Sequence, residues 1–565
     1  MEVDDSRGAR ALQYGFLVAT VLACAVALSP NNVDPDLWGH VQYAEDALAA
    51  GELHTTATHT FTAEGRRWIN HENLSELALA LGYRWLGPQG MLAAKCLLGL
   101  GVVWLMLRTA LRQGVSLPVV CAWLLLVTTT LTAFWAMRPQ LASFALLALL
   151  VVVLDHAFAS WQDDRRARLR PLAVAPVLMI VWANAHGGFA AGLALLVAYL
   201  GLRSLEAIYY LGRRAAPQVA VFALAATVSG LATLVNPYGV GLHRWLIGAM
   251  SRPRPEIIEW LAPQPSDVFF LPMVLLYGLI PCCWIGTQKR RDWTQIVLIG
   301  LFLWQSLLHS RHIPLVAVLA GFWLPVHLQS LVDRFRKPAS PEADSRLGRW
   351  SIGLGLACAM GLLVYKLDAR LRDMPVPRDE YPVDAAQFMA DHDLHGRLVV
   401  NFNWAQYALA ALPNTQVAFD GRFRTCYPQE VIDMHFDFIY GDVPGRRYRS
   451  PHSGAVDGDR VLDHQAPDLV LIDREYRRPR EIMQRRGDFV LLYQDGTAQL
   501  WGRRAVYDQP ASPRYFAASQ RRIGNTPRVG SVTWPALPTR SRGQLANRAA
   551  PTEPTTNLMQ EDHRS

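Results

Sequence analysis

The sequence predicts an α-helical membrane protein with about eleven transmembrane spans and a small α/β domain outside the membrane. Of the 565 residues, 51% are hydrophobic and only 18% are charged, whereas soluble proteins carry about 25% charged residues. Long runs that are nearly free of charge recur through residues 1–370. Beyond that point short β-like runs alternate with polar segments, which is typical of a compact domain in water.

The apolar runs are close to the length that an α-helix needs to cross the hydrocarbon core. We interpret the first, 13–29, as an uncleaved helix because it lacks a clear small-x-small cleavage site before Asn31 and many further spans follow it. A polar loop, 30–73, follows it, and the charged but helically periodic stretch 74–87 predicts an interfacial amphipathic helix. The further predicted spans are 91–111, 116–136, 140–160, 170–184, 188–210, 217–235, 268–286, 293–309, 313–332 and 349–366.

The distribution of lysine and arginine predicts the orientation. With the N-terminus in the cytoplasm, all five cytoplasmic loops carry basic residues, as 165–170 and 289–291 illustrate. The C-terminal domain then lies on the extracytoplasmic side of the inner (plasma) membrane. Much of the net charge of +8 comes from these loops and the C-terminal tail, so we expect membrane lipids and no nucleic acid as partners.

The same alternation places the unusual polar motifs on the extracytoplasmic face, each at or just outside the end of an apolar run. Acids and imidazoles at a membrane boundary are costly unless they are used or well solvated. A shared polar site at the outer boundary is therefore predicted. Its candidate residues are Asp34, Asp36, Trp38, His40, His71, Glu72, Arg138, His186, Arg311 and His312.

The segment Asp34-Pro35-Asp36 is the candidate catalytic centre. A carboxylate in this place can take a proton from an attacking hydroxyl, hold a divalent metal or relay protons. The alternative is a polar turn punctuated by proline. We favour Asp36, with Asp34 as the other candidate base, because Trp38 offers a face for sugar stacking and His40 a hydrogen-bond donor.

The other candidates have structural alternatives as well. Arg138 suits a phosphate by its guanidinium geometry, or it is an interface arginine that snorkels to the headgroups. Arg311 and His312 are candidate phosphate ligands, or they lie at the headgroup level. His71-Glu72 lacks the H-E-x-x-H pattern of zinc sites and is often only a solvated pair. His186 precedes a glycine pair that fits a tight turn.

The predicted extracytoplasmic α/β domain covers 378–505. Its β-like runs are 397–402, 416–419, 469–472, 489–493 and 498–501. Asp420-Gly421 is first of all a turn, and Arg422 and Arg424 with Tyr427 are candidates for acidic sugar or lipid headgroups. Residues 506–565 are rich in Arg, Pro, Ser and Thr, and we expect a disordered tail there.

These motifs resemble the GT-C class of integral-membrane glycosyltransferases, including the protein mannosyltransferase and lipid A aminoarabinose transferase kind. The residues that carry the resemblance are Asp34-Pro-Asp-Leu-Trp-Gly-His40, the segment 51–62 and Trp68 with His71-Glu72. His59 stands where an Asp would be expected.

The resemblance implies a polyprenyl-phosphate-linked sugar donor and a lipid, glycan or protein acceptor. The first-loop aspartate would deprotonate the acceptor hydroxyl, which attacks and inverts the anomeric carbon. Arg138, Arg311 and His312 would hold the leaving phosphate. Some members of the class use a divalent metal, and two acids separated by one residue do not settle the need for it.

Two other functions stay open from the sequence. One is a transporter or flippase of a lipid-linked or anionic solute, which would more often show broken spans in two matching halves. The sequence shows no internal repeat. The other is a non-catalytic membrane scaffold that presents the outer domain.

Overall fold

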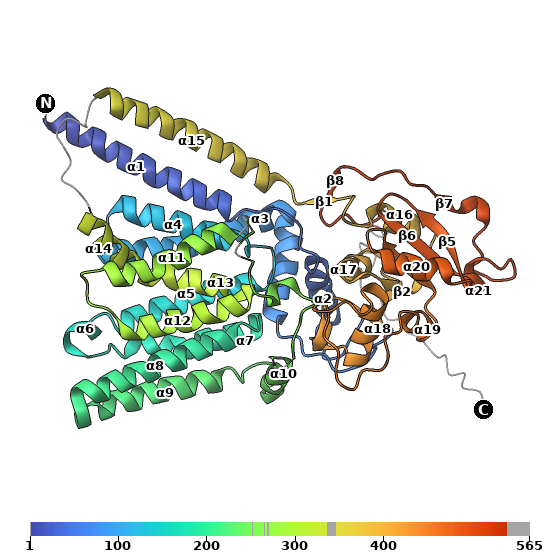
Figure 1. Ribbon diagram of the computed structural model, residues 1–565, viewed down its shortest axis with the longest axis horizontal. Coiled ribbons are helices and arrows are strands. Elements are labelled where there is room, and N and C mark those ends of the chain that lie inside the picture. Colours follow the sequence, from blue (N-terminus) through green and yellow to red (C-terminus); the bar gives the residue numbers. More distant parts are fainter. Residues whose placement is uncertain (1, 251, 265, 268–269, 336–345, 540–565) are drawn as a thin grey trace, which may run out of the picture.

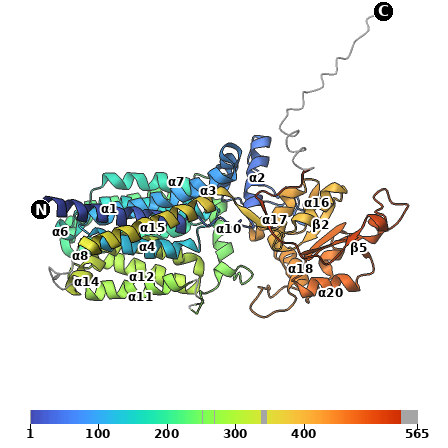
Figure 2. The same ribbon diagram turned by 90° about the horizontal axis from the view of Figure 1, so that it is seen from above.

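The computed structural model describes residues 2–250, 252–264, 266–267, 270–335 and 346–539. It consists of a long helical bundle with an α/β domain at one end of it (Figure 1). The view turned by 90° shows the same separation, with α2 and the start of α3 at the junction (Figure 2). The N-terminus lies at the end of the bundle farthest from the domain.

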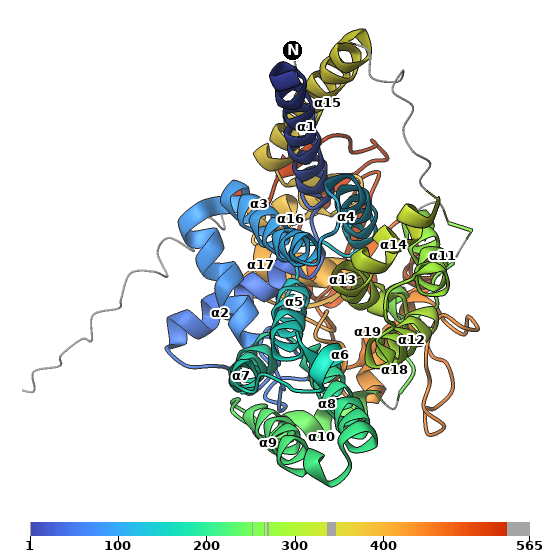
Figure 3. The same cartoon turned by 90° about the vertical axis from the view of Figure 1, so that its left-hand side faces the viewer.

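Each of the predicted spans coincides with a helix of the bundle. Among the described residues, five helical stretches are long and apolar enough to cross a membrane, and a sixth is the pair α13–α14, bent by 61°. Four more apolar helices are shorter. The bundle helices are α1 (Glu2–Ala27), α3 (Asn73–Arg112), α4 (Leu117–Thr132), α5 (Gln140–Ala157), α7 (Ala175–Ala185), α8 (Phe189–Leu211), α9 (Ala216–Ala232), α11 (Leu271–Gly286), α12 (Trp293–Leu308), α13 (Ile313–Trp323), α14 (Pro325–Phe335) and α15 (Arg346–Arg372). Seen along the bundle, α1 and α15 pack against each other at its edge (Figure 3).

The predicted interfacial helix 74–87 and the span 91–111 are the two arms of α3. The helix is broken at Gly87, whose φ of 65° lies in the left-handed region. Glycine adopts this conformation without a Cβ clash. Pro88 follows, and its ring removes a hydrogen bond that would continue the helix through the break.

The first outer loop is more ordered than the sequence predicts, because it contains α2 (Leu37–Ala50). Polar residues interrupt the apolar pattern of this helix, so we expected a loop. Its buried face nevertheless includes Leu37, Val41 and Ala44 at helical spacing. The helix ends at Gly51, which has a φ of 72°. α2 packs against the C-terminal domain rather than against the bundle alone.

The C-terminal domain is built on a six-stranded sheet, and each predicted β run is a strand of it. The strand order is β3-β2-β4-β6-β5-β7, with β3, β2 and β4 parallel to one another. The strands are β2 (Gly396–Val400), β3 (Thr415–Val417), β4 (Leu469–Asp473), β5 (Phe489–Gln494), β6 (Ala498–Arg503) and β7 (Arg522–Ile523). The longer helices are α16 (Val383–Asp391), α17 (Phe402–Ala411), α18 (Gln429–Ile439) and α20 (Arg477–Arg485).

The predicted disordered tail is wrong for residues 506–539, which belong to this domain. Strand β8 (Ser531–Thr533) pairs antiparallel with β1 (Pro375–Pro377). Trp534 is only 1% exposed, and the carbonyl of Pro535 accepts a hydrogen bond from Trp38 Nε1 at 2.8 Å. A few apolar anchors order this segment because the rest of the domain provides their pocket. The remainder of the predicted tail, 540–565, lies outside the described residues.

The first outer loop joins the domain through the edge of the sheet. Thr60 forms a parallel bridge with Val417 of β3, and the Thr62 hydroxyl donates to the Ala418 carbonyl at 2.6 Å. A further contact reaches α17, where the Tyr43 hydroxyl of α2 donates to Gln406 Oε1 at 3.0 Å. The domain and the first loop therefore form one packed unit.

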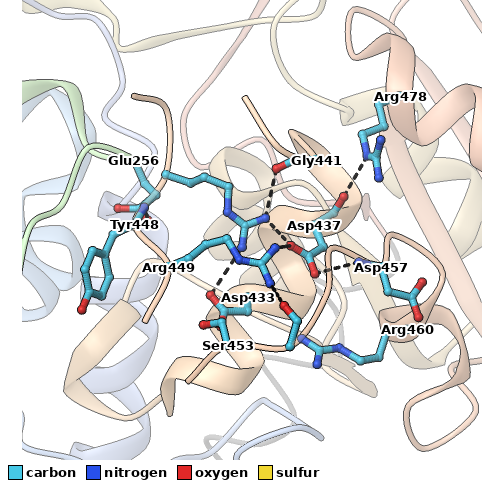
Figure 4. A network of polar contacts seen from close by, with 12 residues as sticks. Glu256, Asp433, Asp437, Gly441, Tyr448, Arg449, Ser453, Asp457, Arg460 and Arg478 are labelled. Atoms are coloured by element: carbon cyan, nitrogen blue, oxygen red, sulfur yellow. Dashed lines mark hydrogen bonds and ion pairs between the residues drawn. The ribbon is translucent and has the colours of Figure 1, made fainter. Parts of the chain in front are cut away.

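A second loop, 252–264, is tied to the same domain. Glu256 Oε1 accepts a hydrogen bond from the Tyr448 backbone N–H at 2.6 Å. Figure 4 shows that the segment around Tyr448 is held by charges: Arg449 pairs with Asp437 of α18 at 3.1 Å, and Ser453 contacts Asp433. This network lets the C-terminal domain fix a loop that belongs to the bundle.

Candidate functional site

Three carboxylates converge on one guanidinium where the bundle meets the domain. Arg138 follows α4 and immediately precedes Pro139. Its Nε lies 2.5 Å from Asp34 Oδ2, its Nη2 lies 3.0 Å from Asp36 Oδ2, and its Nη1 lies 3.5 Å from Glu259 Oε2. One ion-paired guanidinium thus faces three carboxylates, while His40 and Arg311 act on Asp36 and Glu259 from farther away. Such a cluster favours a bound cation, a proton or an incoming hydroxyl.

The local sequence explains how the two first-loop aspartates are presented. Asp34 Oδ1 accepts a hydrogen bond from the Asp36 N–H at 3.0 Å, which closes a turn around Pro35. Asp36 is the residue before the first turn of α2. The Asp34 side chain is 8% exposed and the Asp36 side chain is 31% exposed. Asp36 is therefore the carboxylate that a substrate can reach.

The surroundings of Asp36 favour a proton acceptor. Desolvation by the neighbouring protein raises the pKa of Asp36 from 3.8 to about 6, against the lowering effect of Arg138, and the Asp34 and Glu259 charges add to the rise. The group is thus still ionised at neutral pH, but it is a stronger base than a free aspartate.

A second polar cluster adjoins the first. His40 Nδ1 lies 3.0 Å from Glu76 Oε1, and Asn70 Nδ2 donates to Glu76 Oε2 at 2.6 Å. Burial lowers the pKa of His40, but the Glu76 hydrogen bond and the Glu72 charge outweigh it and raise the pKa to about 9. The pKa of Glu72 is lowered, because nearby histidines, His71 first, outweigh its burial.

The same cluster offers the donors for a divalent cation. Ligand atoms of His40, Glu72 and Glu76 all lie within 4.8 Å of one another. One imidazole nitrogen with carboxylate oxygens suits Zn²⁺ or Mn²⁺. The Asn70 amide orients Glu76 from behind, as outer-shell partners of metal ligands do.

The turn after α7 brings His186 to Glu72. Ser143 Oγ accepts from Trp182 Nε1 at 2.7 Å, so its own hydroxyl donates to His186 Nδ1 at 2.7 Å. The Gly188 N–H also points at Nδ1, at 3.0 Å. Nδ1 is thus the acceptor, and the protonated Nε2 faces Glu72 Oε1 at 3.6 Å.

The glycine pair of this turn is required by close packing. A Cβ on Gly187 would lie 2.9 Å from the His71 ring, and one on Gly188 would lie 2.4 Å from Ser143 Oγ. His71 Nε2 lies 3.9 Å from Glu72 Oε1. Predicted residues that lie far apart in the sequence therefore meet in one site, namely His71-Glu72 and His186.

Arg311 and Arg254 both lie against the ring of Trp260, beside these acids. The Arg311 guanidinium lies 4.4 Å from the centroid of the Trp260 ring, and the Arg254 guanidinium lies 4.6 Å from the same ring. Arg311 feels the charges of Glu259, Glu72 and Arg138, yet it makes no ion pair with any residue that the structure describes. It is a cation available to an anionic ligand.

Two expectations from the sequence need correction. Trp38 is 1% exposed and packed against Tyr381 and Tyr407, so it has no face for a sugar. His312 stays a candidate phosphate ligand, and its Nδ1 lies 3.4 Å from the Gln305 carbonyl. Arg422 is buried in a bidentate pair with Asp420, so it is not open to headgroups.

The Asp420-Gly421 turn has a more direct relation to the site than its sequence indicates. A Cβ on Gly421 would lie 2.4 Å from Asp36 Oδ1 and 2.6 Å from Gln406 Nε2. The backbone of the C-terminal domain thus lies directly against the candidate base. Only glycine leaves room for the Asp36 carboxylate there.

No protein-family model matches the sequence, and no curated protein matches it. The structure is similar to ArnT from Cupriavidus metallidurans in the apo state, with a TM-score of 0.52 at 13% identity, over 86% of this chain and 96% of that chain. It is similar to the same protein bound to undecaprenyl phosphate, with a TM-score of 0.51 at 14% identity, over 86% and 97%. The chain has a GT-C fold.

The GT-C fold confirms the resemblance that the first-loop motif carries, and with the apolar helices it makes the chain an integral membrane protein. An apo oligosaccharyltransferase from Archaeoglobus fulgidus also matches, with a TM-score of 0.49 at 10% identity, over 81% of this chain and 69% of that chain. At these identities the likeness concerns the fold.

Several residues of the candidate site were not predicted from the sequence. Glu259, Trp260 and Arg254 come from the short loop between α10 (Val240–Met250) and α11, which we passed over as a connection. This loop contains charged residues and a tryptophan between prolines, and that pattern could have identified it as part of the site. Glu76 was treated as part of an amphipathic helix, although it lies one turn after Glu72.

Proposed function

We propose that this chain is a membrane glycosyltransferase that moves a sugar from a polyprenyl-phosphate donor to an acceptor hydroxyl at the outer face. The observation that carries the proposal is the convergence of Asp34, Asp36 and Glu259 on Arg138, with Asp36 the most exposed of the three carboxylates. The likeness to ArnT bound to undecaprenyl phosphate supports the choice of donor class.

The reaction follows from the roles of these groups. Asp36 takes the proton of the acceptor hydroxyl while the hydroxyl oxygen attacks the anomeric carbon. The bond from that carbon to the phosphate oxygen breaks, and the polyprenyl phosphate leaves with the electron pair. Attack opposite the leaving group inverts the anomeric carbon. Asp34 acts as a positioning residue, because it holds the Asp36 backbone N–H.

The leaving phosphate needs a cation that is not already committed. Arg138 is engaged by three carboxylates, so we assign the phosphate to other cations. Arg311 and Arg254, which both lie against the Trp260 ring, suit this role better. Guanidinium groups form paired hydrogen bonds with phosphate oxygens. They would stabilise the charge that develops on the leaving group.

A divalent cation is part of the proposal as a ligand of His40, Glu72 and Glu76. When bound it would supply electrostatic stabilisation next to the phosphate. Treatment with EDTA followed by metal analysis and reconstitution with Zn²⁺ or Mn²⁺ tests this. Retention of one metal per chain in the wild type and its loss in Glu76→Gln are the expected results; no retained metal in either protein contradicts it.

The orientation is also proposed. The N-terminus lies in the cytoplasm, and the domain that follows α15 lies outside, in agreement with the basic loops at the far end of the bundle. Cysteine accessibility in intact cells tests it, with a single added cysteine in the domain expected to react with an impermeant reagent.

The function itself is tested with purified protein in detergent and a panel of polyprenyl-phosphate sugars. Released polyprenyl phosphate is expected with one of the donors. A transporter or flippase would instead move the intact donor across proteoliposomes without releasing the phosphate. No release with any donor, together with such movement, would contradict the proposal.

A further inference from the structure

A cavity of about 650 Å³ lies where the first outer loop, α10 and the C-terminal domain meet. Its lining is strongly cationic, because four arginines contribute to it and no carboxylate does. They are Arg66, Arg67, Arg244 and Arg424. Trp245 and Tyr427 add aromatic walls. Four guanidiniums around one space repel one another unless an anion neutralises them.

These guanidiniums form no ion pair within the part of the chain that the structure describes, although the Glu256 charge acts on Arg424 from farther away. Arg66, Arg67 and Arg244 form no ion pair there. Nε and Nη2 of Arg424 are buried without a hydrogen-bond partner, while its Nη1 donates to the Pro253 carbonyl at 2.8 Å. An arginine atom buried in this way is costly unless a ligand completes its hydrogen bonds.

A glycine keeps this cavity open on the side of α10. A Cβ on Gly241 would lie 2.9 Å from Nη2 of Arg67. Any larger residue would displace the Arg67 guanidinium from the lining. The cavity is thus formed by contributions that lie far apart in the sequence, from the first loop, α10 and the segment 424–428.

One aromatic ring separates this cavity from the candidate active site. The Trp245 ring lies 4.9 Å from the His71 ring, centroid to centroid, and His71 adjoins Glu72. Trp245 Nε1 donates to the Arg424 carbonyl at 3.2 Å, which fixes the indole as a shared wall. Arg254 lies close enough to feel the charges of both Arg424 and Arg311.

The outer surface of α10 points to a ligand that comes from the membrane. Val240 is 51% exposed and Ile247 is 72% exposed. Their spacing puts them on the same helix face as Arg244. α10 lies at the end of the bundle next to the domain (Figure 1), where an apolar face interrupted by arginine is typical of a helix at the membrane–water interface.

We propose that this cavity binds the acidic headgroup of a membrane-anchored acceptor, with phosphate or carboxylate groups as the anions. The inference rests on the proposed function, since it assigns the second substrate of the same site. The donor phosphate is assigned to Arg311, so the two anionic groups have separate cations. Guanidinium groups bind both anions by paired hydrogen bonds.

The test uses inorganic pyrophosphate as the probe and calorimetric titration of the full chain in detergent at low salt. The double variant Arg67→Gln/Arg244→Gln should bind pyrophosphate at least about tenfold more weakly than the wild type, as the loss of two charge-assisted contacts predicts. The double variant Arg166→Gln/Arg168→Gln removes the same charge at the far end of the bundle and should bind like the wild type. Arg311→Gln identifies any pyrophosphate bound at the donor site, and the cavity site should persist in it.

Wild-type affinity in Arg67→Gln/Arg244→Gln would overturn the proposal, and so would the absence of pyrophosphate binding in the wild type. Nanodiscs distinguish the source of the anion. If pyrophosphate still binds in phosphatidylglycerol discs, the result supports an acceptor site. If pyrophosphate is displaced in phosphatidylglycerol discs but not in phosphatidylcholine discs, the cavity is a site for bulk lipid, and the acceptor assignment is overturned. Pyrophosphate binding without any sugar transfer would instead leave the cavity standing and count against the proposed function.

Discussion

The two ends of the helical bundle each hold a cluster of buried charges, but only one of the two clusters is balanced. At the far end, Arg203 pairs with Glu206 at 3.0 Å and with Asp292 at 2.6 Å, and Arg165 lies 3.8 Å from Glu206. Two arginines there pair with two carboxylates, and a third carboxylate, Asp155, accepts a hydrogen bond from Trp323 Nε1 at 3.1 Å. Beside the C-terminal domain, three carboxylates share Arg138.

The difference separates a structural network from a functional one. The far-end acceptors are also used by neutral donors: Glu206 accepts from Trp161 Nε1 and from the Thr294 hydroxyl. Among the described residues, only Arg203 Nε and Asp155 Oδ2 are buried in this far-end cluster without a hydrogen-bond partner. The excess of negative charge around Arg138, with Asp36 partly exposed, is unfavourable for stability. Such arrangements are typical of sites that function maintains.

Among the substitutions considered, Arg203→Gln in the far-end cluster is expected to have the largest effect on stability. It leaves Asp292 and Glu206 without their main cation at a side chain that is 1% exposed. We expect a loss of about 3 kcal/mol or more in the free energy of unfolding. The turnover of the protein that stays folded should be unchanged. Unfolding in detergent and transfer per folded molecule measure the two effects, and a fall in specific turnover would show that the far end is not merely structural.

Arg311→Gln tests the cation of the unbalanced end that we assign to the phosphate. Loss of a charge-assisted contact of about 2 kcal/mol should raise KM for the donor by about thirtyfold. Stability should change little, because no ion pair of a described residue is broken. Donor titrations measure the change. Arg254→Gln should behave alike, and an unaltered KM in both variants would contradict the assignment.

The pH dependence of the rate sharpens the comparison. Asp36 must be ionised to accept a proton, and its pKa is raised to about 6. As pH falls through that value the group becomes protonated, so kcat/KM should fall by about tenfold for each pH unit below 6 and level off above 7. Initial rates across this range measure it. A rate that stays constant between about pH 5 and pH 7 would contradict a base with this pKa.

Gly421→Ala gives the smallest of the expected effects. The added Cβ would contact Asp36 Oδ1, so the carboxylate or the turn must shift. We expect a fall in turnover of up to about tenfold, because a small misplacement of a reacting group is costly. Gly454→Ala is the matched control in the same domain, since nothing lies within 4 Å of its added Cβ. Equal turnover in the two variants would show that the domain does not set the position of Asp36.

The sequence was a better guide to the bundle and the strands than to the junction between them. Apolar runs and β-branched runs fix local structure, so each span and strand was predicted close to its place. The helix α2 was missed because its buried face is completed by α17, which lies more than three hundred residues later. Residues 506–539 were assigned to a tail for the same reason, since the pocket of Trp534 belongs to the domain.

The site residues that belong to a sequence motif were predictable, whereas those that only packing brings to the site were not. The first-loop aspartates, Glu72, His186 and Arg311 were identified from charge at the ends of apolar runs, and the structure brings them together. Trp38 was assigned wrongly because the sequence does not show which face of a helix is covered. Glu259 was missed because its role depends on Arg138, with which it shares no sequence pattern.

The central claim is that Asp36 is a base held in an unfavourable charge cluster for the sake of the reaction. The most direct test measures thermal unfolding and released polyprenyl phosphate on the same preparation of Asp36→Asn. We predict a protein at least as stable as the wild type, because one of three competing carboxylates is gone, with turnover lower by about a thousandfold. A variant that is less stable yet keeps its turnover would show that Asp36 is a structural partner of Arg138 and not the base.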